Sequence, residues 1–80
     1  MTRAQYDQIL ADKDFPKGYF AKAVLDGRQR LSGADLAGKA RRYSMWYMRQ
    51  IRRVLAVCAR YGVYETVTRH NKRILPPLNT

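Results

Sequence analysis

The sequence predicts a single, mainly α-helical domain with a small C-terminal β-hairpin. Two observations carry this prediction: apolar residues recur at helical spacing up to Gly62, and beyond it the chain is rich in β-branched and aromatic residues. A chain of 80 residues can build only one modest core, since folding at this size buries about 60% of the unfolded surface. The expected units are N-terminal helices over 1–27, two helices joined by a turn over 28–62, the hairpin over 63–77 and a tail over 78–80.

The first helix is expected over about residues 3–11. Thr2 and Gln5 have the spacing of a capping box, in which each side chain binds the backbone N–H of the other residue. The apolar residues that follow fall on one helical face: Tyr6, Ile9 and Leu10.

Two further helices are expected before the middle of the chain. Pro16 can open the second helix, over about 16–25, and Asp26-Gly27 can close it. Ser32 can cap a third helix that ends near Arg41 or Arg42, because Asp35 then places a negative charge in its first turn.

The longest predicted helix begins after Ser44 and ends near Tyr61, where Gly62 provides the C-cap. At about 100° per residue, one side of it collects the predicted buried stripe: Ser44, Tyr47, Met48, Ile51, Leu55, Cys58 and Gly62. The other side collects a cationic stripe: Met45, Trp46, Arg49, Arg52, Arg53, Ala56 and Arg60. Because the arginines oppose the apolar side, the helix is expected to pack on its own domain and to face an anionic partner, not a membrane.

The segment after Gly62 predicts the β-hairpin. Residues 63–69 alternate in the manner of a strand, His70-Asn71 can form a two-residue turn, and residues 72–75 can return before Pro76 and Pro77 end the pairing. This arrangement would place cationic side chains at the hairpin tip.

The net charge of +10 is concentrated in the second half of the chain. Residues 1–40 carry seven basic and five acidic side chains, whereas residues 41–80 carry nine basic side chains and only Glu65. Clustered lysine and arginine favour binding to a polyanion, because they release the counterions condensed on it. The alternative is a solvated basic surface.

The sequence gives no support for an enzyme, a metal site or a cofactor. Cys58 and His70 are the only cysteine and histidine, so an internal disulfide and a structural zinc site are excluded, and Cys58 is expected to be a small core residue. The longest apolar run has six residues, against about 20 for a membrane span, and the N-terminus has no signal-peptide pattern. A cytoplasmic protein without membrane contact is expected.

The order of helix, tight turn, longer helix and hairpin resembles the winged helix-turn-helix family. The resemblance covers about residues 31–75. It rests on the small apolar residues Leu36, Ala37 and Ala40 in the supporting helix, on the turn at 41–44, on the recognition helix at 46–60 and on the wing at 63–75. The turn is taken as one residue longer than usual in the family, because Gln50 would otherwise occupy a core position.

The resemblance implies DNA binding, with the recognition helix in the major groove and the wing on the backbone. The candidate DNA-binding residues are Arg41, Arg42, Ser44, Trp46, Arg49, Arg52, Arg53, Arg69, Lys72 and Arg73. Arg49 and Arg53 are expected to reach base edges or phosphates. Arg41 and Arg42 are expected at phosphates beside the helix N-terminus. Trp46 is expected either to stack on the nucleic acid or to pack on a neighbouring loop.

The function expected from these observations is sequence-specific binding of double-stranded DNA by a small bacterial or phage transcriptional regulator. Tyr6, Ile9 and Leu10 are candidates for a homodimer interface, and they could equally belong to the core. An alternative is a phage or mobile-element protein that inhibits a host protein by presenting its basic face to an acidic surface. A third hypothesis is RNA binding, for which the usual stacking signatures are absent.

Overall fold

A computed structural model describes residues 1–28, 31, 35 and 44–74. Four helices have described bounds: α1 (Arg3–Ala11), α2 (Tyr19–Leu25), α4 (Met45–Arg60) and α5 (Tyr64–Ile74). No strand occurs in these parts of the chain, so the protein is mainly helical, as predicted. Of the predicted third helix, the structure describes only Asp35, which is helical and fully buried. Leu36, Ala37 and Ala40 lie outside the described residues.

Helix α1 begins at the predicted capping box. The backbone N–H of Gln5 donates to Thr2 Oγ1 over 3.1 Å, and the backbone N–H of Thr2 donates to Gln5 Oε1 over 2.8 Å. Ile9 is fully buried, and Tyr6 and Leu10 pack against the same core. The Tyr6 hydroxyl also donates to Asp26 Oδ1 over 2.6 Å, which ties α1 to the end of α2. These apolar residues therefore belong to the core of their own domain.

Helix α2 is shorter than predicted. It begins at Tyr19, three residues after Pro16, because Gly18 has a φ of 116° that interrupts the helical backbone. It ends as expected before Gly27, whose φ of 74° is left-handed. Ala21, Val24 and Leu25 are buried in the core.

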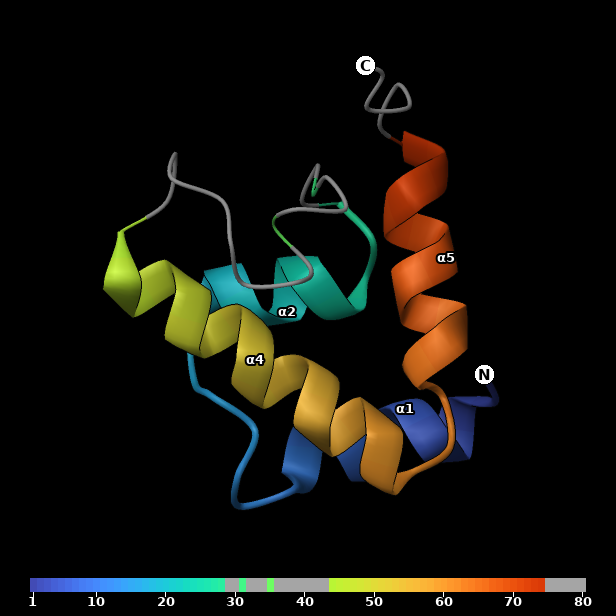
Figure 1. Ribbon diagram of the computed structural model, residues 1–80. Helices are drawn as coiled ribbons and strands as arrows, with labels where there is room; N and C mark the ends of the chain where they lie inside the picture. Colours follow the sequence, from blue (N-terminus) through green and yellow to red (C-terminus); the bar gives the residue numbers. More distant parts are fainter. Residues whose placement is uncertain (29–30, 32–34, 36–43, 75–80) are drawn as a thin grey trace.

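Helix α4 has the predicted bounds and ends before Gly62, which has a φ of 75°. Its cationic stripe is exposed, as predicted, but the buried side is broader than the predicted stripe: Met48, Gln50, Ile51, Val54, Leu55, Val57 and Cys58. The prediction was wrong for Ser44, Tyr47 and Gly62, which are exposed. The buried side of α4 is broader than predicted because two helices, α2 and α5, both pack on it (Figure 1). Together they cover more of the circumference of α4 than a single stripe of residues does.

The predicted hairpin is wrong for the described residues, because residues 64–74 form the helix α5. Val63, Val67 and Asn71 are all buried, and a spacing of four places them along one side of a helix. The Asn71 Nδ2 group donates to the backbone oxygens of Val67 and Val24, over 2.9 and 3.2 Å. The second bond joins α5 to α2, so tertiary packing overrides the β-propensity of this segment.

The core lies where α2, α4 and α5 meet, and α1 lies behind the C-terminal half of α4 in Figure 1. Cys58 of α4 is fully buried in this core, as predicted. Desolvation raises the pKa of its thiol to about 11, which keeps the side chain neutral. It is a packing residue and not an activated nucleophile.

A substitution at Thr66 distinguishes α5 from a strand. Thr66 is exposed in the helix, and alanine has the higher helix propensity. We expect Thr66→Ala to raise the free energy of unfolding by about 0.5 kcal/mol, measured by urea denaturation. In a strand, loss of the β-branched side chain would lower it instead.

Candidate nucleic-acid interface

The exposed side of α4 carries one aromatic and three cationic side chains in a shallow hollow. The hollow has a volume of about 410 Å³ and is lined by Trp46, Arg49, Gln50, Arg52 and Arg53. These residues recur at intervals of one helical turn, so the helix itself aligns them. Gln50 forms part of the lining although only 8% of its surface is exposed.

The charge environment of two of the arginines bears on what this side of α4 can bind. In the described part of the chain, no carboxylate lies within ion-pair distance of Arg49 or Arg53. Both are exposed on the middle turns of α4. Their positive charge is therefore directed to the solvent or to an anionic partner.

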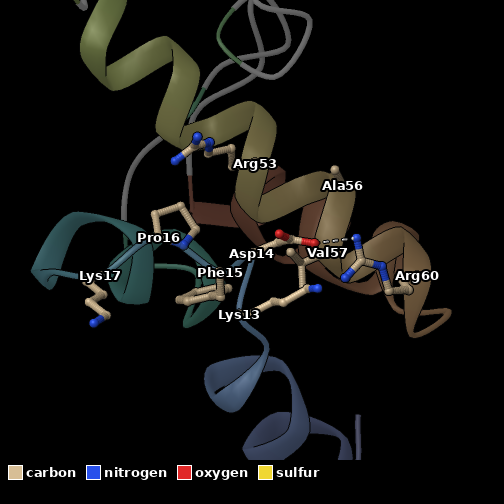
Figure 2. A pocket seen from close by; sticks show the side chains of 9 residues that line it. All are labelled: Lys13, Asp14, Phe15, Pro16, Lys17, Arg53, Ala56, Val57 and Arg60. Atoms are coloured by element: carbon tan, nitrogen blue, oxygen red, sulfur yellow. Dashed lines mark hydrogen bonds and ion pairs between the residues drawn. The ribbon is translucent and has the colours of Figure 1, made fainter.

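A second hollow, of about 450 Å³, lies between α4 and the segment that connects α1 to α2. The lining of this hollow includes two exposed lysines of the connecting segment, Lys13 and Lys17. Its apolar lining includes Phe15, Pro16 and Val57. Figure 2 shows Arg53 of α4 across the pocket from Lys13 and Lys17.

Arg53 lines both hollows, so they adjoin each other along α4. The result is one basic surface, which we define by the cations Lys13, Lys17, Arg49, Arg52 and Arg53. It combines side chains from two separate parts of the chain.

Arg60 belongs to the predicted cationic stripe, which was expected to face an anionic partner, but the structure pairs it with two carboxylates of its own chain. Its guanidinium group donates to Asp12 over 3.0 Å and to Asp14 over 2.9 Å. The Tyr61 hydroxyl also donates to Asp12, over 2.8 Å. We call these four residues the Arg60 clasp; it fixes the end of α4 to the segment between α1 and α2. Figure 2 shows its pair of Arg60 with Asp14.

The Arg60 clasp makes folding stability depend on pH. The pKa of Asp12 is lowered from 3.8 by the backbone N–H of Asp14 and by the hydroxyl of Tyr61, followed by the guanidinium of Arg60. A lowered pKa means that the stabilisation is complete above about pH 4 and is lost as the pH falls through the lower folded value. We expect the stability difference between the native protein and Asp12→Asn to shrink between pH 6 and pH 3 in urea denaturation, and a constant difference would contradict this role.

An aromatic cluster borders the basic surface at the start of α4. The ring centroids of Trp46 and Tyr47 lie 4.8 Å apart in an edge-to-face arrangement, with an interplanar angle of 83°. Tyr47 also contacts Phe20 of α2, with centroids 4.7 Å apart. Trp46 therefore has a defined neighbour and remains 55% exposed.

The structure brings together only part of the predicted site. Trp46, Arg49, Arg52 and Arg53 share one hollow, whereas Arg69 lies on α5, where it forms an exposed ion pair with Glu65 at 3.9 Å. Ser44 is the N-cap residue of α4, but its side chain makes no capping hydrogen bond. The remaining candidates have side chains outside the described residues: Arg41, Arg42, Lys72 and Arg73. Of these, Lys72 and Arg73 lie within the bounds of α5.

Two cations of the basic surface and one lining residue of the first hollow were not predicted. Lys13 and Lys17 precede α2 in a part of the sequence where acidic and basic residues balance each other. Only the fold places these two lysines near Arg53. Gln50 was expected outside the core, yet it is buried and lines the first hollow. A polar residue between buried positions of an amphipathic helix was the available signal for Gln50.

Comparison of the chain with protein-family models, curated proteins and solved structures found no match. Across the described residues, no helix has both the length and the apolar character that a membrane span requires.

Proposed function

We propose that this protein binds double-stranded DNA through the basic surface on α4. The observation that carries the proposal is the alignment of Arg49, Arg52 and Arg53 on the exposed side of a helix whose other side is buried in the core. A helix held in this way presents its cations on the side away from the core, while its buried apolar residues anchor it to α2 and α5. A major groove about 12 Å wide admits such a helix.

The charges around α4 support a polyanionic partner over a small anion. The cations of the basic surface extend from Arg49 on α4 to Lys17 at the second hollow. In Figure 2, Arg53 lies on one side of this hollow, and Lys13 and Lys17 lie on the other. Phosphates repeat along a duplex, so a spread of cations can contact several of them. In this proposal Lys13 and Lys17 bind phosphates while α4 lies in the groove.

Sequence preference would come from the arginines in the middle of α4. The guanidinium group of Arg49 or Arg53 can donate two hydrogen bonds to the O6 and N7 atoms of guanine. Discrimination between base pairs is what a small transcriptional regulator requires. The hairpin wing has no part in this proposal, because α5 occupies that segment.

A salt titration with random duplex DNA tests the proposal. If most of the five cations of the basic surface contact phosphates, the logarithm of the binding constant should fall against the logarithm of the salt concentration with a slope of about −3 to −4.5. Fluorescence anisotropy of a labelled duplex measures this slope. Absence of binding at low salt, or a slope near zero, would overturn the proposal and favour an acidic protein as the partner.

A further inference from the structure

We infer that the aromatic cluster at the start of α4 is a stacking site for an unpaired nucleobase, so that the preferred substrate is a duplex with a single-stranded extension. This inference rests on the proposed function. Binding of the arginines in the groove gives Trp46 and Tyr47 no role, and this inference assigns them one. The cluster is defined as Phe20, Trp46 and Tyr47.

The indole of Trp46 has ring surface to offer to a ligand. An edge-to-face contact at 83° uses at most one of its two faces, and 55% of the residue remains in contact with solvent. An exposed tryptophan at this angle to its neighbour can accept a planar group on its open surface. A nucleobase is such a group, and stacking on tryptophan is tolerant of base identity.

The aromatic cluster is anchored to the core through Phe20 of α2. Phe20 belongs to α2 and packs against the core, and its ring contacts Tyr47 at 4.7 Å. Tyr47 in turn supports Trp46. The stacking ring is therefore connected through two aromatic contacts to a second helix, and it requires less ordering when a ligand binds than a lone surface side chain does.

Continuity with the basic surface identifies the occupant. Trp46 lines the same hollow as Arg49, one turn further along α4, so a chain of phosphates over the arginines leads to the indole. The bases inside a duplex already stack on each other and offer no free face. The base that reaches Trp46 must therefore be unpaired, at the point where the duplex ends or opens.

The experiment uses Trp46 as its own probe, because it is the only tryptophan in the chain. A blunt duplex is compared with the same duplex carrying a five-nucleotide 3′ or 5′ extension. We expect one of the extended duplexes to bind about 10-fold more tightly and to quench the Trp46 fluorescence, while the blunt duplex changes it little.

Two variants with matched aromatic changes complete the test. Trp46→Ala should reduce the affinity ratio of extended to blunt duplex to about one, and Trp46→Phe should retain part of it because a ring remains. The control is Tyr64→Ala, which removes an aromatic residue of 44% exposure from α5 and should leave the ratio unchanged. Circular dichroism checks that each variant is folded.

The outcomes separate this inference from the proposed function. Equal affinity for blunt and extended duplexes, with a steep salt dependence for both, would overturn the stacking site and leave duplex binding intact. A fluorescence change with anionic lipid vesicles but not with extended DNA would also overturn it and indicate a membrane contact. If neither form of DNA binds, the proposed function itself fails.

Discussion

Replacing Arg49 and Arg53 together by alanine should weaken duplex binding by about 100-fold. Each arginine that contacts a base or a phosphate is worth about 1–3 kcal/mol, and these two have no carboxylate partner among the described residues. If they contact phosphates, the salt slope should also become shallower by about two. If they contact bases, the variant should instead lose its preference between sequences.

The matched control removes two other exposed arginines. Arg3 of α1 and Arg69 of α5 each form an exposed ion pair with a carboxylate four residues away. Arg3→Ala with Arg69→Ala changes the net charge by the same amount on other helices. We expect it to weaken binding by less than about threefold, since long-range charge alone is screened at physiological salt. An equal loss from both pairs would show that binding follows net charge and not the surface on α4.

Replacing Ile51 by alanine should lower the free energy of unfolding by about 3 kcal/mol. Ile51 is fully buried on the side of α4 that faces the core, so the change removes apolar contacts and leaves a cavity. A domain of 80 residues has a total stability of only about 4–12 kcal/mol. The expected fall in melting temperature is roughly 12–24 °C, which thermal denaturation followed by circular dichroism can measure.

A graded substitution controls for the size of the cavity. Ile51→Val removes one methylene group and should cost only about 1 kcal/mol. A loss below 1 kcal/mol for the alanine variant would mean that α4 is not anchored through this side chain. Its basic surface would then lack the rigid support that the proposed function requires.

Local signals in the sequence were sufficient for two helices. The capping box at Thr2 and Gln5 fixes the start of α1, and Gly62 fixes the end of α4. Both depend on contacts within one turn of backbone, so the sequence alone contains them. The opposition of apolar and cationic sides along α4 was predictable for the same reason, because it follows from helix geometry.

The error over α5 has a specific cause. Val63 and Val67 are four residues apart, a spacing that satisfies both the period of two in a strand and a single turn of a helix. The residue that distinguishes them is Asn71, predicted as a turn residue but buried and bonded to the backbone of Val24 in α2. That contact spans 47 positions, so no local pattern could show it.

The candidate site was predicted where it lies on one helix and missed where the fold assembles it. Trp46, Arg49, Arg52 and Arg53 share the stripe that the helical angle defines. Lys13 and Lys17 join them only through the packing of the segment between α1 and α2. Arg60 belongs to the same stripe and was therefore predicted as part of the cationic side. In the structure its positive charge is neutralised by the carboxylates of the clasp.

The Arg60 clasp also bears on the entropy of association. It places the carboxylates of Asp12 and Asp14 near the basic surface, where their negative charges would oppose the binding of a polyanion. In exchange, it holds the backbone that carries Lys13 and Lys17 against α4 before any ligand arrives. Less freedom is then lost on binding. If the basic surface binds DNA as proposed, the two acidic residues favour affinity through preorganisation while opposing it through charge.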